Sequence, residues 1–148
     1  MRRMRGQALV FFALVIPMVL VPVGAYAVDA SALATRAAHL QEVAALAAEQ
    51  GAQQVDVDNL RQGGGFRVDS SAAAGVVTAT VQATEPSASV TSVVVSATLV
   101  TVTLSERVPV PVNVLSRSEV TLAAQASARL TAGYDNPSSF LPLPTSTF

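Results

Sequence analysis

The chain has 148 residues, of which 51% are hydrophobic and only 13% are charged, with a mean hydropathy of +0.47. A soluble globular domain carries about 25% charged residues, so this composition indicates a membrane segment or a very apolar β-domain. The length excludes a large multidomain enzyme. The absence of cysteine excludes disulfides, zinc–thiolate sites and iron–sulfur clusters, and a net charge of −1 argues against a nucleic-acid partner.

An uncharged apolar run covers residues 8–28. As a helix it would be about 32 Å long, which is enough to cross a hydrocarbon core of about 30 Å. Arg2, Arg3 and Arg5 precede the run, whereas the residues after it carry six arginines and ten acidic side chains. This asymmetry predicts a cytoplasmic start at residues 1–7, a transmembrane helix at 8–28 and an extracytoplasmic remainder.

Two prolines, Pro17 and Pro22, lie inside the apolar run, and Gly24 follows them. Each proline removes one backbone hydrogen bond, which neighbouring helices or local rewinding can replace in a membrane. Two interpretations are therefore open. The helix is kinked and packs against partners through Phe12, the prolines and Gly24, or it is a slightly bent lone anchor.

A cleaved secretory signal is the alternative to a membrane anchor. The start is basic, and Ala25-Tyr26-Ala27 fits the small-x-small pattern of a cleavage site after Ala27. The apolar region of a signal peptide has about 7–15 residues, and the apolar run here is longer. The sequence after Ala27 also keeps its helical character, so the uncleaved anchor is favoured.

Residues 29–50 predict a helix that continues the first one. They contain no glycine or proline and are dominated by Ala, Leu, Gln and Glu, which favour helices. Gly51 is expected to end the helix. An apolar stripe at helical spacing consists of Leu33, Ala37, Leu40 and Ala44. Its small side chains predict close packing, either in a helical bundle with other subunits or on the chain's own β-domain.

The N-terminal third of the chain carries a characteristic order of short motifs. They are Gly6-Gln7-Ala8-Leu9-Val10, Phe12-Ala13-Leu14, Pro17, Val28-Asp29, Leu40-Gln41 and Gly51-Ala52. This order resembles the start of the Tad (Flp-type) pilus-assembly proteins of the TadE/TadG-like kind, over residues 5–52. The resemblance implies a single-pass membrane protein of an adhesive surface pilus. Its partners would be membrane lipid, other pilus or secretion-system subunits, and further copies of itself.

Two positions depart from the family's pattern. Ala45 stands where the family usually has an aspartate in the run after Leu-Gln. Members that are processed after the glycine carry a glutamate five residues beyond the cut, and here Phe11 occupies that position. Phe11 therefore argues against cleavage between Gly6 and Gln7, and the chain is more similar to the unprocessed, TadG-like members.

Residues 51–75 are rich in glycine and polar side chains, and they predict a flexible connector with one short strand at 66–68. The triple glycine at 63–65 has no following Lys-Ser or Lys-Thr, so it is not a phosphate-binding loop. Asp56 and Asp58 are followed by Leu60 instead of further acidic ligands, so the segment does not predict a calcium site.

Residues 76–134 predict a β-rich domain. Strands are expected at 76–83, 90–96, 98–104 and 120–130, where β-branched or alternating residues lie between turn signals. Pro109 and Pro111 make 108–115 an edge or connecting segment. Residues 135–148 are expected to form a disordered or extended tail. The fold class is thus α+β, in which a long N-terminal helix crosses the membrane, continues outside and precedes a small, mainly antiparallel β-domain.

The sequence offers little chemistry. The single histidine, His39, lies near Glu42 on the predicted helix and is expected to be a surface residue. No nucleophile motif, paired metal ligands or dinucleotide fingerprint occurs. We therefore expect a structural protein without catalytic residues, cofactor, metal or small-molecule substrate. Its small Val/Ala/Leu core is expected to need support from its own helix or a partner.

Overall fold

The computed structural model describes residues 4–110 and 118–131. Its helices are α1 (Met4–Ala52), α2 (Val57–Arg61) and α3 (Ser70–Thr84), and its strands are β1 (Ser89–Val95), β2 (Leu99–Pro109) and β3 (Glu119–Arg129). A long N-terminal helix is thus followed by a small three-stranded antiparallel sheet with further helices. The α+β class expected from the sequence is confirmed.

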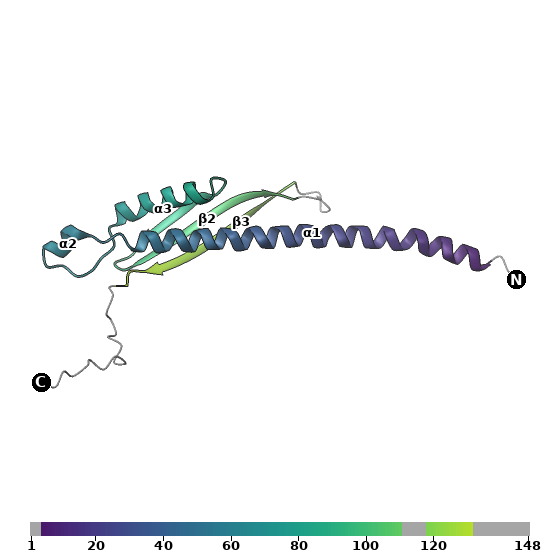
Figure 1. Ribbon diagram of the computed structural model, residues 1–148, viewed down its shortest axis with the longest axis horizontal. Coiled ribbons are helices and arrows are strands. Elements are labelled where there is room, and N and C mark those ends of the chain that lie inside the picture. Colours follow the sequence, from purple (N-terminus) through teal and green to yellow (C-terminus); the bar gives the residue numbers. More distant parts are fainter. Residues whose placement is uncertain (1–3, 111–117, 132–148) are drawn as a thin grey trace, which may run out of the picture.

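Helix α1 is continuous and passes through both Pro17 and Pro22. Its first half extends away from the other elements, and its second half lies along the sheet (Figure 1). The helix predicted at residues 29–50 is confirmed and ends at Ala52. Gly51 lies inside this helix and does not stop it. A Cβ at this position would lie 2.9 Å from Cγ2 of Val77, so the glycine allows a close approach to α3.

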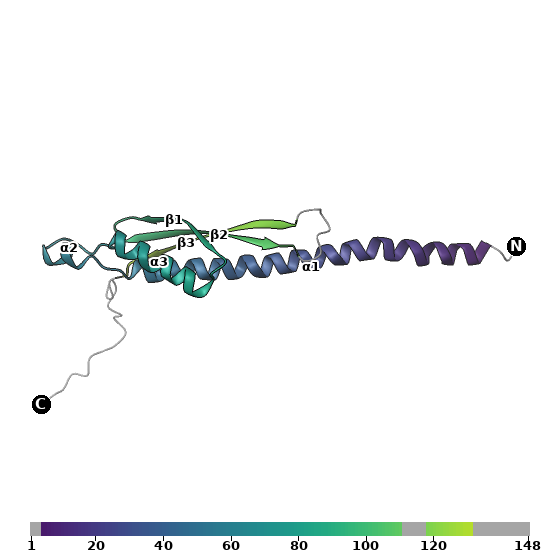
Figure 2. The same ribbon diagram turned by 90° about the horizontal axis from the view of Figure 1, so that it is seen from above.

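The sheet has the order β1-β2-β3, with antiparallel neighbours throughout. Strand β1 is irregular between Val90 and Ser92, whereas β2 and β3 pair without interruption along their length. The strands lie side by side, and α1 continues far beyond them in the view from above (Figure 2). The strands predicted at 90–96, 98–104 and 120–130 are confirmed, although β2 continues to Pro109.

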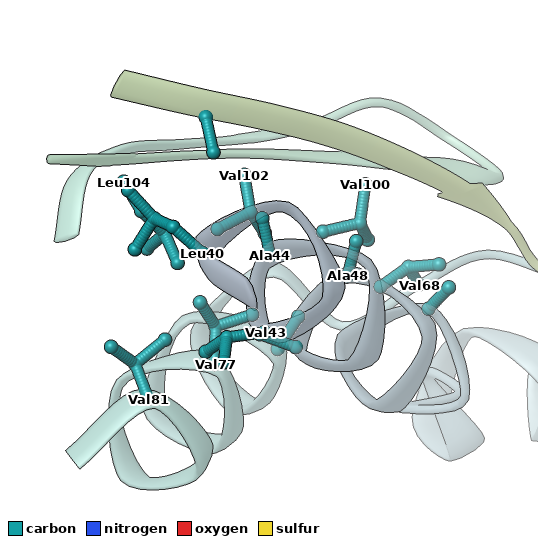
Figure 3. Close-up of a cluster of buried hydrophobic side chains, with 14 residues drawn as sticks. Leu40, Val43, Ala44, Ala48, Val68, Val77, Val81, Val100, Val102 and Leu104 are labelled. Carbon is teal, nitrogen blue, oxygen red and sulfur yellow. The ribbon is translucent and has the colours of Figure 1, made fainter. Parts of the chain in front are cut away.

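Helices α1 and α3 pack against the sheet and enclose one hydrophobic core. In Figure 3, the core side chains of α1 lie between those of β2 and those of α3. The labelled residues are Leu40, Val43, Ala44 and Ala48 of α1, Val77 and Val81 of α3, Val100, Val102 and Leu104 of β2, and Val68. The residues of β2 alternate in burial, since Val100, Val102 and Leu104 are fully buried and Thr101 and Thr103 between them are half-buried. The core therefore includes the second half of α1 as an integral part.

The strand predicted at residues 76–83 is wrong, because this segment belongs to helix α3. Its valines and threonines alternate, but Ala73, Val77 and Val81 also recur every four residues and form the buried face of the helix. Asp69 caps the helix by accepting hydrogen bonds from the backbone N–H groups of residues 71 and 72. Packing on α1 and the cap therefore outweigh the β-propensity of the residues.

The segment 51–75 is more structured than the predicted flexible connector. It contains the end of α1, the short helix α2 and the start of α3. The predicted strand at 66–68 is reduced to a single bridge between Val68 and Val55, and Asp56 caps α2 by accepting the N–H of Asn59. The predicted tail at 135–148 and residues 111–117 of the predicted link lie outside the described residues.

Candidate functional site: an apolar helix end and a charged cluster

The first half of α1 exposes large apolar side chains to the surroundings. Between residues 9 and 28 every large apolar side chain except Val15 is exposed; Leu14, for example, is 67% exposed. Among the described residues, α1 is the one helix that is long and apolar enough to cross a membrane. A soluble surface rarely presents an apolar area of this extent, so this half-helix is a candidate binding surface.

The four residues predicted for membrane packing lie on this half-helix. Phe12 is 59% exposed, and its ring meets Phe11 edge-on with the ring centroids 6.0 Å apart. A Cβ at Gly24 would have no neighbour within 4 Å. Pro17 and Pro22 are also exposed. These residues are therefore accessible to lipid or to another helix.

Burial along α1 begins at the end of the apolar run. From Leu9 onward, Asp29 is the first buried residue of the helix, and the continuous buried face starts at Leu40. Of the predicted stripe, Leu40 and Ala44 are fully buried against the chain's own domain, Leu33 is half-buried and Ala37 is exposed. The second half of the stripe thus contributes to the chain's own core and not to a free surface.

A charged cluster joins α1 to the rest of the domain just before this buried face. We define it as Arg36 and His39 of α1, Glu85 and Ser87 between α3 and β1, and Glu106 of β2. The Arg36 guanidinium lies 3.1 Å from Oε2 of Glu85 and 3.3 Å from Oε1 of Glu106. Nε2 of His39 lies 3.2 Å from Oε2 of Glu85. One arginine therefore bridges two carboxylates that come from different elements.

Glu106 is the most buried member of the cluster, with an exposed fraction of 4%. Its Oε1 contacts Arg36 and accepts a hydrogen bond of 2.9 Å from the hydroxyl of Ser87. Its Oε2 is buried without a hydrogen-bond partner. Removing one partner of a buried carboxylate is strongly destabilising, so Arg36 is important for keeping α1 against β2.

Glu85 is held ionised by its neighbours. The hydrogen bond from the Ser87 hydroxyl is the largest cause that lowers the pKa of Glu85, while burial opposes it and the charges of Arg36 and His39 lower it further. Because a serine hydroxyl carries one hydrogen, Ser87 shares it between Oε1 of Glu85 and Oε1 of Glu106. The Ser87 hydroxyl thus joins the turn after α3 to β2.

The sequence did not reveal this cluster, because Arg36 and Glu85 are 49 residues apart. His39, which was expected to be a surface residue near Glu42, is partly exposed but lies closer to Glu85 than to Glu42. Its distance from the Glu42 carboxylate is 4.0 Å. The only local signal was the spacing of Arg36 and His39, because residues three apart on a helix lie on the same face.

Open depressions lie on the described residues, and one between α1 and α3 is lined mainly by apolar side chains, among them Leu46, Val76 and Ala79. A depression of about 390 Å³ beside the charged cluster is lined by hydroxyl and charged side chains, namely Ser87, Ser89, Ser105, Glu106, Arg107 and Thr121. In the part of the chain that the structure describes, no group of three or more His, Cys, Asp or Glu residues could hold a metal ion. No family model, curated protein or solved structure matches the chain.

Proposed function

We propose that the protein is a single-pass, membrane-anchored structural component. The observation that carries this proposal is the division of α1, whose first half is apolar and exposed and whose second half is part of the domain core. Hydrocarbon is the environment in which such an exposed apolar half-helix is favourable. The continuity of α1 means that the anchor and the domain form one mechanical unit.

The N-terminus is proposed to lie in the cytoplasm and the domain outside it. Support comes from Arg2, Arg3 and Arg5 before the apolar run and from the acidic excess after it. The specific role, a minor pilin-like or anchoring subunit in the assembly of a Tad-type pilus, rests on the sequence resemblance over residues 5–52. A structural role also agrees with the charged cluster, whose contacts join α1 to β2 and to the turn after α3.

The mechanism is physical. The charged cluster and the core hold the second half of α1 against the sheet, so a force on the domain is transmitted to the membrane helix without a flexible joint. The polar outer face of the sheet carries hydroxyl pairs such as Thr101 with Ser127, whose oxygens lie 2.8 Å apart. Contacts of the domain with other subunits would use such exposed surfaces, while the anchor keeps the domain near the membrane.

The mature N-terminus of the membrane-bound protein tests this proposal directly. We expect the full chain in the membrane fraction, resistant to extraction with alkaline carbonate and starting at Met1 or Gln7. The alternative is a secreted or surface module with a signal peptide cleaved after Ala27. A carbonate-soluble product that starts at Val28 would establish that alternative and contradict the anchor.

The pilus assignment needs its own test. We expect genes for a secretion ATPase and a pilus platform beside this gene, and loss of surface pili on its deletion. Restoration by the wild-type chain, but not by a chain that lacks residues 8–28, would link the phenotype to the anchor. Normal piliation in the deletion strain would contradict the assignment and leave the membrane anchor unaffected.

A further inference from the structure

Two backbone carbonyls in the exposed half of α1 lack their usual hydrogen-bond donors. In an α-helix the N–H of residue i bonds to the carbonyl of residue i−4. Pro17 and Pro22 have no N–H, so the carbonyls of Ala13 and Met18 receive no such bond. Helix α1 continues as an α-helix from Met4 to Ala52 through both prolines, so the two carbonyls lie inside the helix and not at one of its ends.

The side chains of this segment cannot replace the missing donors. Between residues 8 and 28 only Tyr26 carries an O–H or N–H group. It lies eight residues beyond Met18, or about 12 Å along the helix axis, which exceeds the reach of a tyrosine side chain. Serine and threonine, which often satisfy such carbonyls in membrane helices, do not occur before Ser31.

These carbonyls belong to residues in the exposed half of α1. Ala13 is exposed, and Met18 is 73% exposed. The hydrocarbon core contains no water to satisfy a free carbonyl, so a donor from another molecule is favoured there. The two carbonyls are about 7.5 Å apart along the axis and about 140° apart around it. Each carbonyl is therefore a separate position for a donor.

We propose that the carbonyls of Ala13 and Met18 are docking positions for transmembrane helices of a different protein that carry serine, threonine, asparagine or glutamine side chains. This inference rests on the proposed membrane anchor. A second copy of this chain does not fit the positions, because its own residues 8–28 offer no donor except Tyr26. The partner must therefore differ from this chain in the polarity of its membrane helices.

Fluorescence energy transfer in phosphatidylcholine vesicles tests the proposal on the full chain. The protein has no cysteine, so Ala30→Cys gives one labelling position next to the apolar run. The probe is a polyleucine transmembrane peptide with one serine at its centre and one serine five residues to either side. Met18 is the middle residue of the run 8–28 and Ala13 lies five residues from it, so a serine lies at the depth of each carbonyl in either orientation of the peptide. An all-leucine peptide is the reference. We expect the serine peptide to associate about three- to tenfold more strongly, in line with hydrogen bonds between membrane helices.

Proline variants identify the carbonyls as the cause. Pro17→Ala and Pro22→Ala restore the backbone N–H groups and close the helix bonds to Ala13 and Met18, so each should reduce the preference for the serine peptide and the double variant should abolish it. Pro86→Ala is the matched control, because Pro86 lies in an exposed turn of the domain. This control should keep the full preference.

Equal association of both peptides with the wild-type chain would overturn the inference. A preference that survives in the double proline variant, or self-association of the chain that exceeds its association with the serine peptide, would also overturn it. Flotation of the vesicles separates this inference from the proposed function. Failure of the chain to float with vesicles would contradict the anchor itself, whereas flotation without a serine preference would contradict only the docking positions.

Discussion

Gly51 shows how one hydrogen atom in place of a methyl group sets the distance between α1 and α3. A Cβ there would lie 2.9 Å from Cγ2 of Val77 and 3.4 Å from Cγ1 of Val100. Val77 is β-branched and sits in a helix, so its methyl groups cannot rotate away without strain. The choice of glycine at this position is therefore a packing requirement of the core.

We predict that Gly51→Ala destabilises the domain by about 1 kcal/mol, because a steric cost of roughly 1–3 kcal/mol exceeds a gain in helix propensity of about 1 kcal/mol. Thermal unfolding of the full chain in a non-ionic detergent measures the change. Gly24→Ala is the control and should cause no loss, since a Cβ there meets nothing within 4 Å. A Gly51→Ala variant as stable as the wild type would refute the packing argument.

Glu85 makes the stability of the domain depend on pH in a predictable direction. Its pKa in the folded protein is lowered from an ordinary value of 4.5, chiefly by the hydrogen bond from Ser87. A lowered pKa contributes stability that is present above the unfolded value and is lost as the pH falls through the folded value. We therefore expect the wild-type chain to lose stability progressively below about pH 4.5.

The variant Glu85→Gln should be less stable than the wild type at pH 7 and should show a smaller loss on acidification. Thermal unfolding in the same detergent between pH 7 and pH 3.5 measures both effects. Glu42→Gln is the control, because the side chain of Glu42 is 81% exposed and its ion-pair contact to His39 is 4.0 Å long. Identical pH profiles for wild type and Glu85→Gln would contradict the assigned role of Glu85.

At the scale of elements, local patterns were sufficient where one periodicity dominated. The helix over residues 29–50 and the strands at 98–104 and 120–130 followed from composition and alternation. Residues 76–83 fit two periods at once, and only the α1 surface and the Asp69 cap select the helix. The charged cluster needed the tertiary fold, since Arg36, Glu85 and Glu106 are distant in sequence and adjacent in space.

Helix α1 should respond to substitution according to the face affected. Leu40 is 1% exposed in the core and Leu46 is 40% exposed on the same helix. Leu40→Ala should cost about 2–5 kcal/mol, through lost burial and a cavity. Leu46→Ala should cost less than about 1 kcal/mol, as expected for a partly exposed position. Equal losses in thermal unfolding would show that α1 does not pack on the sheet through the Leu40 face.

At the scale of the whole molecule, the apolar residues that the sequence has in excess lie in two separate places. Most residues of α1 between Leu9 and Val28 are exposed, whereas Leu40 and most of the valines and alanines after it form a core with α3 and the sheet. The small domain gains its support from its own helix, which was one of the two alternatives for the apolar stripe. Anchor and core therefore share one continuous element, and the charged cluster lies between them.

The most direct test of the central claim is the accessibility of single cysteines along α1 in intact cells. Leu14→Cys, Ala37→Cys and Asp58→Cys would be treated with a membrane-impermeant maleimide, in a chain that has no other cysteine. We predict labelling at positions 37 and 58 from outside and no labelling at position 14 until the membrane is dissolved in denaturing detergent. Labelling of Leu14→Cys in intact cells as fast as Asp58→Cys would contradict the claim that the first half of α1 lies in the membrane.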